Sequence, residues 1–271
     1  MKYFDSHAHY YDERFESECS EGVDNLIGAL LENQVSGIIN VGTSPETSRL
    51  AINQAKRYRN MFTAIGIHPS DSQYLKNPIE KELLEIEELI KNPESKCVCL
   101  GEIGLDYHYP DTDRECQMLY FEEQMRLAEH LDIPVSIHDR EAHADVLDVI
   151  KKHPNVRGVL HSYSGSAEMA LELICLGYMI SFSGTLTFTN AKKPKEVAAA
   201  IQADKILIET DCPYLAPHPN RGKLNHSGYL EYTNRTLASL IGLTEQETAE
   251  LTESNARRFF GLNEKSNVHS L

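Results

Sequence analysis

Short apolar runs recur at fairly even spacing along the chain, and each is followed by a stretch with helical periodicity. The runs cover residues 3–4, 37–41, 61–67, 97–103, 133–137, 156–160, 178–182 and 206–208. Strands separated by helices of this length form parallel βαβ units, and eight such units in about 260 residues match a closed barrel. The pattern therefore predicts an α/β fold with a single, slightly distorted (β/α)8 TIM barrel, which is favoured over an open sheet.

Several of the predicted helices carry capping signals. Asn77 is placed as an N-cap, Pro78 at the first helical position and Glu80 two residues later, and an apolar stripe at helical spacing follows. Comparable signals stand at Ser44-Pro45 and at the Thr244 and Glu247 pair, and a further buried helical stripe is marked by Met118, Phe121, Met125 and Ala128.

Length and composition favour one large domain. The chain has 271 residues with 41% hydrophobic content and no linker or repeat that would divide it, so we expect a barrel over residues 1–262 and a frayed tail over 263–271. No apolar stretch approaches the roughly 20 residues of a membrane span, and no export signal is evident. We expect a cytoplasmic, non-membrane protein whose cysteines are reduced core residues: Cys19, Cys97, Cys99, Cys116, Cys175 and Cys212.

The net charge of −15 restricts the possible partners. A protein that grips long duplex DNA normally presents a basic face and releases counterions, and this composition offers none. Any nucleic-acid activity must therefore use a local cationic site, such as bound metal, on a strand end or a short strand.

Polar residues stand directly after several apolar runs, where a TIM barrel carries its active site. The first run ends in Asp5-Ser6-His7-Ala8-His9, and residues two apart on a strand point to the same face, so both imidazoles can reach one ion. Metal-capable residues stand at five strand ends in all: His7, His9, Glu102, His138, His161 and Asp211.

Four imidazoles and two carboxylates suit Zn, Mn, Fe, Ni or Mg rather than Ca. Two divalent ions fit this set if Glu102 bridges them, with His7, His9 and Asp211 on one ion and His138 and His161 on the other. The ions would outweigh the charge of the two carboxylates and attract an anion such as a phosphodiester. Asp211 would orient a water and accept its proton. The competing interpretations are a helix N-cap for Asp211 and a glycine-rich turn for Glu102.

Other polar residues at the strand ends are open to two interpretations each. His68, Asp106 and His108 are phosphate contacts or plain turn residues, and Glu209 is either of these or an orienting partner two residues before Asp211. Tyrosines such as Tyr107 and Tyr163 stack on bases or cap the barrel mouth. The cationic candidates bind substrate phosphates or are solvated surface: Arg140, Arg221 and Lys223.

The residues from Asp5 to about Phe260 resemble the TatD-type metal-dependent deoxyribonucleases of the amidohydrolase-like superfamily. The resemblance implies a (β/α)8 barrel, divalent metals at the six residues named above, and hydrolysis of DNA phosphodiesters, often from a 3′ end. It is carried by residues 5–9, Gly66-Ile67-His68-Pro69, residues 101–107, Ile137-His138, His161 with Ser164-Gly165, and Glu209-Thr210-Asp211 with Pro213-Tyr214-Leu215.

The chain departs from the commonest family pattern in three places, and none removes a metal ligand. Asp139 precedes Arg140 where serine is frequent, and Ser162-Tyr163 replaces cysteine and phenylalanine. After Arg221-Gly222-Lys223, the segment 224–227 lacks an expected second arginine and a Glu-Pro pair, which bears on phosphate binding there.

Three functions remain open from the sequence. The first is a two-metal deoxyribonuclease acting in the 3′ to 5′ direction on single-stranded or frayed DNA ends, as a monomer without an obligate protein partner. The second is a metal-dependent hydrolase of a small amide, lactone or phosphoester, because barrel folds exchange substrates through their loops. The third is a binding module without catalysis, which would not need the water-activating carboxylate of Asp211.

Overall fold

The chain folds into a barrel of eight parallel strands, as the apolar pattern predicts. A computed structural model describes residues 1–262, so the predicted tail over 263–271 lies outside the described residues. The strands pair in sequence order. They are β1 (Tyr3–Ala8), β2 (Val35–Val41), β3 (Met61–Ile65), β4 (Cys97–Asp106), β5 (Val135–Arg140), β6 (Gly158–Leu160), β7 (Met179–Phe182) and β8 (Ile206–Ile208).

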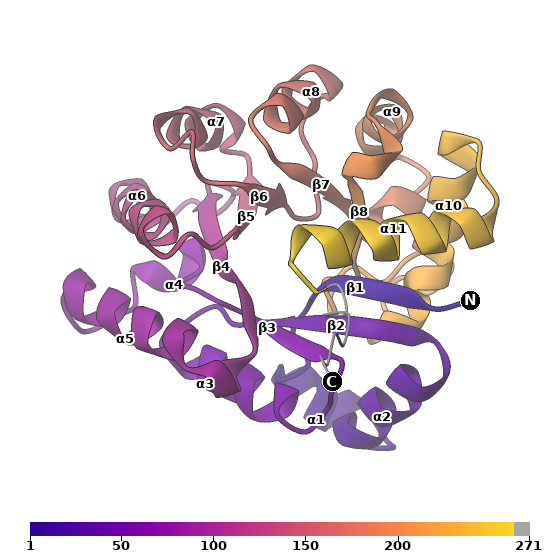
Figure 1. Cartoon of the computed structure of the whole chain (residues 1–271), viewed down its shortest axis with the longest axis horizontal. Helices are drawn as coiled ribbons and strands as arrows, with labels where there is room; N and C mark the ends of the chain where they lie inside the picture. The colour runs from indigo at the N-terminus through magenta and orange to yellow at the C-terminus, as the bar shows by residue number, and fades with distance from the viewer. Residues whose placement is uncertain (263–271) are drawn as a thin grey trace, which may run out of the picture.

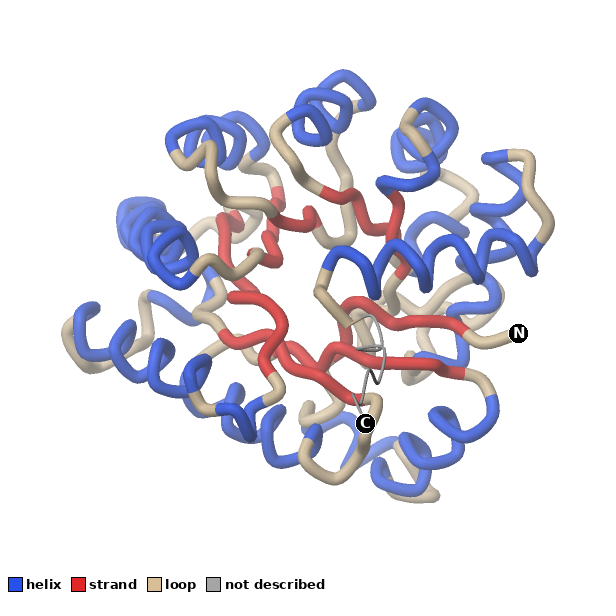
Figure 2. The backbone as a smooth tube through the Cα atoms, in the orientation of Figure 1, coloured by secondary structure: helices blue, strands red, loops and turns tan. Residues whose placement is uncertain are grey.

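Helices surround the strands, as Figures 1 and 2 show in a view along the barrel. No helix of the described residues is long and apolar enough to cross a membrane. The helices are α1 (Glu13–Glu18), α2 (Val23–Asn33), α3 (Pro45–Ala55), α4 (Pro69–Ser72), α5 (Ile79–Lys91), α6 (Arg114–Leu131), α7 (His143–Lys152), α8 (Ala167–Cys175), α9 (Lys192–Ala200), α10 (Leu230–Ile241) and α11 (Glu245–Phe259), with 3-10 turns η1 (Pro93–Ser95), η2 (Gly184–Thr187), η3 (Ala203–Lys205) and η4 (Ser227–Tyr229).

Capping explains where most of these helices begin. Ser44 and Thr47 form a capping box at α3, and Thr244 and Glu247 form another at α11, as predicted. The prediction for α5 is wrong by one residue: Pro78 is the N-cap and the helix begins at Ile79. The Asn77 side chain instead donates to Glu82 Oε1 at 2.7 Å, so the acidic partner is two residues further along the helix than Glu80.

The prediction for the cysteines is only partly right. All six thiols are free, but only Cys99 and Cys212 are buried, and Cys175 is exposed. Cys97 and Cys116 lie half-buried at the edge of the core. Cys175 is the last residue of α8, and the spacing of apolar residues in the sequence does not show whether a side chain at a helix end is buried.

The interior of the barrel is apolar at one end and polar at the other. At the amino ends of the strands the last helix, α11, crosses the opening (Figure 1), and Ala256 and Phe260 close the core of inward-facing strand side chains. At the carboxyl ends, β8 meets β1 through the bond from Asp211 N to His7 O (2.9 Å) and that from His9 N to Cys212 O (2.7 Å). The barrel is therefore completed at the end where polar side chains converge.

Candidate metal centre

The six predicted metal ligands lie together at the carboxyl ends of the strands. His7 is in β1 and His9 follows it, while Glu102 lies in β4 and His138 in β5. His161 follows β6 and Asp211 follows β8. Together with His68, they offer donor atoms that form three overlapping groups in which every pair of atoms lies within 4.8 Å: His7-His9-Asp211, His7-Glu102-His161 and His68-Glu102-His138.

The carboxylate of Glu102 connects the two halves of the cluster. Its Oε2 lies 3.3 Å from His7 Nε2 and 3.7 Å from His9 Nε2. Its Oε1 lies 2.8 Å from His138 Nδ1 and 2.7 Å from His161 Nε2. One carboxylate therefore presents one oxygen to each of two sets of nitrogen donors, which is the arrangement of a ligand that bridges two cations.

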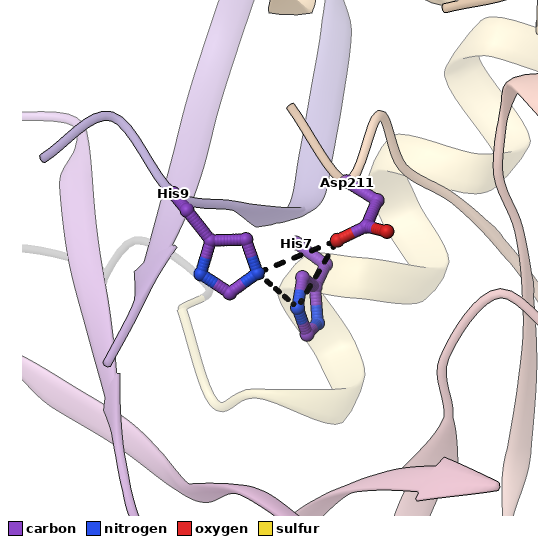
Figure 3. A group of neighbouring side chains, drawn as sticks. All are labelled: His7, His9 and Asp211. Carbon is purple, nitrogen blue, oxygen red and sulfur yellow. Dashed lines mark hydrogen bonds and ion pairs between the residues drawn. The ribbon is translucent and has the colours of Figure 1, made fainter. Parts of the chain in front are cut away.

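The first set is formed by His7, His9 and Asp211, drawn in Figure 3 with their donor atoms turned toward one another. The two Nε2 atoms are 3.1 Å apart, and Asp211 Oδ1 lies 3.3 Å from His9 Nε2 and 3.8 Å from His7 Nε2. Donors around a tetrahedral zinc ion are about 3.3 Å apart, because the bonds are about 2 Å long. The separations in this set fit a divalent cation between the three side chains.

The histidines of the centre are each oriented by the hydrogen-bond partner of the ring nitrogen that does not face the centre. His9 Nδ1 donates to Val41 O at 2.7 Å, which leaves Nε2 free to bind a cation. The second set uses carboxylates for the same purpose: His138 Nε2 lies 3.1 Å from Asp106 Oδ2, and His161 Nδ1 lies 3.2 Å from Glu209 Oε1. Asp106 and Glu209 thus fix the imidazole orientations of this set, whereas the sequence left Asp106 as a phosphate contact or a turn residue.

His68 differs from these histidines, although its Nε2 also faces the centre, 3.5 Å from Glu102 Oε1. Its Nδ1 accepts a hydrogen bond from Ser70 N at 3.1 Å, so the neutral ring carries its proton on Nε2. Burial lowers the pKa of His68 to about 3, which keeps the ring neutral. His68 is therefore a hydrogen-bond donor aimed into the site rather than a ligand.

Burial and mutual contacts shape the charges of the centre. Burial raises the pKa of Glu102, but its contacts with the neighbouring histidines, chiefly His161, outweigh burial and hold that pKa well below its usual range. Burial lowers the pKa of His161, yet the neighbouring carboxylate of Glu102 raises it well above its ordinary value. The centre thus pairs an ionised carboxylate with protonated imidazole, and a divalent cation displaces such protons when it binds.

The glycines that flank Glu102 permit the close approach of β4 and β5. A Cβ on Gly101 would lie 2.7 Å from Ser136 Cβ, and one on Gly104, where φ is +132°, would lie 2.0 Å from His138 O. A side chain at either position would push β4 away from β5. The glycines therefore set the distance between Glu102 and His138.

Asp5 is a buried residue whose hydrogen bonds position the strand ends that carry the centre, and the sequence does not predict this role. It accepts hydrogen bonds from Thr210 N (3.0 Å), Thr210 Oγ1 (2.6 Å) and Ser227 Oγ (2.6 Å), and from His7 N (3.3 Å). Burial raises the pKa of Asp5 to about 6. Because Thr210 adjoins Asp211, this carboxylate joins the two strand ends that supply the first set of donors.

Two adjoining cavities open above the centre. The first has a volume of about 510 Å³, and Glu102, Asp211 and His68 are part of its lining. The second has a volume of about 490 Å³ and extends toward Tyr163 and Leu215. The centre is therefore open to a substrate larger than one phosphate group.

The other predicted substrate contacts fall into two groups. Arg140 lines both cavities, with Nη1 at 3.4 Å from Tyr109 OH. Arg221 lies over the ring of Phe188 and Lys223 Nζ donates to Asn220 Oδ1, and neither residue lines either cavity. Sequence order alone did not separate the two groups.

The aromatic candidates are also placed differently from the expectation. Tyr107 donates its hydroxyl to Asp145 and stacks against Arg114 on the outer surface, and Tyr163 is buried. Tyr109 and Tyr214 are exposed and line the first cavity. His108 turns toward Glu141, 2.7 Å away, on the exposed side of its loop.

The barrel and its donor set define a metal-dependent hydrolase, with a centre suited to divalent cations at the carboxyl ends of the strands. The sequence matches the family described as TatD related DNase over residues 4–261, and the chain belongs to this family, as its motifs predict.

Similar proteins agree with this assignment. The uncharacterized metal-dependent hydrolase YabD of Bacillus subtilis is 38% identical over 262 residues, covering 96% of this chain and 99% of that protein. The uncharacterized metal-dependent hydrolase TatD of Mycobacterium tuberculosis is 32% identical, covering 94% and 97%. The crystal structure of YjjV, a TatD homolog from Escherichia coli K12, superimposes with a TM-score of 0.86 at 27% identity, covering 96% and 98%.

Proposed function

We propose that the chain is a deoxyribonuclease that removes nucleotides from single-stranded or frayed DNA ends in the 3′ to 5′ direction, using two divalent metal ions. The observation that carries the proposal is the carboxylate of Glu102, whose two oxygens face separate sets of donors on the floor of an open cavity. When bound, two such ions supply a nucleophilic water at neutral pH and stabilise negative charge on phosphate oxygens. The family description as a DNase points to the same substrate.

The chain supplies the remaining chemistry. Asp211, whose carboxylate faces the first cavity, accepts a proton from the attacking water as the new P–O bond forms and the ester P–O bond breaks. The leaving oxygen takes up a proton from solvent. His68 donates from Nε2 to a phosphate oxygen, and Arg140 offers its guanidinium at the rim of the same cavity.

The net charge of −15 supports a substrate end over long duplex DNA, because the cations that attract phosphate are confined to the centre. In this proposal the protein acts as a cytoplasmic monomer on short single strands. A small amide, lactone or phosphoester is the competing substrate class.

The test follows 5′-labelled single-stranded DNA after metal removal and reloading with Mg, Mn, Zn, Ni or Fe. We expect stepwise shortening that requires metal, is lost in Asp211→Asn and persists in Asp145→Asn, whose carboxylate bonds Tyr107 outside the centre. RNA and blunt duplex of the same sequence define the preference. If wild-type protein leaves every oligonucleotide intact with each metal and hydrolyses a small ester, lactone or amide, the nuclease proposal is wrong.

A further inference from the structure

Aromatic side chains with exposed faces gather at the mouth of the barrel. Among the described residues, three tyrosine side chains are exposed: Tyr74, Tyr109 and Tyr214. They come from three different segments: after α4, after β4 and after β8. All three line cavities at the carboxyl ends of the strands. Large exposed aromatics are costly to leave in water, and their grouping at one place indicates a binding surface.

The cavities form a continuous track. The first cavity, above the metal centre, shares Tyr109 and Tyr214 with the second. A third cavity of about 380 Å³ contains Tyr74 and shares Ser70 and Tyr109 with the first. Tyr109 therefore lines all three cavities, whereas Tyr214 lines the first and the second.

Two of the rings are held in place by neighbouring side chains. Tyr214 donates its hydroxyl to Asp12 Oδ2 at 2.6 Å, and Arg14 Cζ lies 5.8 Å from its ring centroid. Arg140 Cζ lies 5.4 Å from the ring centroid of Tyr109. A ring that is oriented before binding loses little conformational entropy when a planar ligand stacks on it.

The charge of the surface indicates which part of a nucleic acid such rings contact. Acidic residues line the track beside the tyrosines, with Asp12 in the first cavity and Asp111 in the third, and the chain carries a net charge of −15. Arg140 is the one arginine or lysine among the residues that line the three cavities, so the track disfavours phosphates away from Arg140 and the centre, whereas stacking on uncharged bases is compatible with it.

We propose that Tyr109 and Tyr214 are base-stacking residues that bind unpaired nucleobases on either side of the phosphate above the metal centre, and that Tyr74 extends this track. The proposal rests on the nuclease function proposed above and adds how the site selects its substrate. The faces of a base inside a duplex are covered by its neighbours, so the tyrosines select single strands and frayed ends.

The experiment removes single bases from the substrate and single rings from the enzyme. Each oligonucleotide carries one abasic nucleotide, placed at successive positions from the 3′ end. The rate of cleavage of each oligonucleotide is measured for wild type, Tyr109→Leu and Tyr214→Leu. The matched control is Tyr232→Leu, because Tyr232 pairs with Arg235 on α10 in the same way, 5.9 Å from ring centroid to Cζ, and lines none of the three cavities.

For wild type and the control, we expect an abasic nucleotide at a contacted position to lower kcat/KM by about 5- to 150-fold, which corresponds to stacking of about 1–3 kcal/mol per base. Each tyrosine variant should lower kcat/KM on the intact strand and show no further loss at one position, a different position for each variant. An abasic penalty that is the same in all four proteins overturns the proposal.

Binding separates this inference from the nuclease proposal. Fluorescence anisotropy measures the Kd of the same oligonucleotides with Mg²⁺-loaded protein, whether or not they are cut. Binding that depends on the bases and on Tyr109 and Tyr214, without cleavage, supports the stacking track and refutes the nuclease. Absence of base-dependent binding together with base-independent cleavage supports the nuclease and refutes the track, and absence of both binding and cleavage refutes both.

Discussion

Asp106 provides the sharpest test of how the centre is assembled, because the sequence and the structure assign it different roles. The sequence predicts that Asp106 contacts a substrate phosphate or is a turn residue. In the structure its Oδ2 lies 3.1 Å from His138 Nε2 and orients that imidazole ring. We predict that Asp106→Asn weakens metal binding and leaves substrate affinity unchanged once metal is saturating. An amide keeps the shape but loses the charge that favours a proton on Nε2, so the proton can move to Nδ1, the nitrogen that faces Glu102.

The size of the effect follows from this contact. Burial raises the pKa of Asp106, but the hydrogen bond with His138 outweighs it and lowers that pKa, so the wild-type contact involves an ionised carboxylate. Loss of a carboxylate that orients a metal-binding histidine costs about 10- to 100-fold in metal affinity. This corresponds to about 1.4–2.7 kcal/mol. The backbone of the loop stays in place in Asp106→Asn, because Asp106 N donates to Gln117 Oε1 at 2.9 Å and asparagine keeps the Oδ1 that accepts from His108 N at 3.0 Å.

The assay is a titration of metal-free protein with Zn²⁺ in the presence of a competing chelator, followed by kinetics at saturating metal. Glu209→Gln should behave like Asp106→Asn, because Glu209 Oε1 holds His161 Nδ1. Asp145→Asn, a carboxylate outside the centre, should bind metal like wild type. If metal affinity is unchanged in Asp106→Asn while KM rises, Asp106 is a substrate contact and the reasoning from imidazole orientation is refuted.

Three further predictions concern stability, pH and the basic loop. Gly104→Ala should lower the free energy of unfolding by about 2–5 kcal/mol in urea titrations, since the new methyl meets His138 O and φ is positive; a loss below about 1 kcal/mol contradicts this. The contact with Asp139 raises the pKa of His143, so the Tm advantage of wild type over His143→Gln in metal-free protein should be full below about pH 6.5 and decline as pH rises through the raised pKa; an advantage that grows with pH has the wrong sign. Arg221→Ala should change kcat/KM on a single strand less than about 2-fold, because Arg221 lies outside both cavities, and a loss above 10-fold would restore it as a phosphate contact.

The barrel could be predicted from sequence because its strands are buried on both faces. Residues such as Ile39, Leu100 and Ile137 lie in continuous apolar runs, and the spacing of these runs fixes the number of βα units. Helix boundaries were less certain, as the start of α5 shows. Asn77 and Pro78 suit a helix start in either register, and the contact of Asn77 with Glu82 decides between them.

The ligand set could be predicted for a related reason. Residues at the carboxyl ends of parallel strands converge whatever their separation in sequence, so His7 and Asp211 are brought together by the fold itself. The contacts of Asp5 with Thr210 and Ser227 could not be predicted, since they join residues more than 200 positions apart and no spacing rule applies.

The roles of the histidines depend on a detail that sequence does not contain, namely the partner of the second ring nitrogen. His68 and His161 both follow a strand and both face Glu102 Oε1, so their positions alone make them equivalent. His161 donates from Nδ1 to the Glu209 carboxylate, so a cation can displace the proton on its Nε2, whereas His68 accepts from Ser70 N and must keep its proton on Nε2. A strand-end histidine is thus a ligand or a donor according to one hydrogen bond on its far side, and that bond is set by the loop that follows the strand.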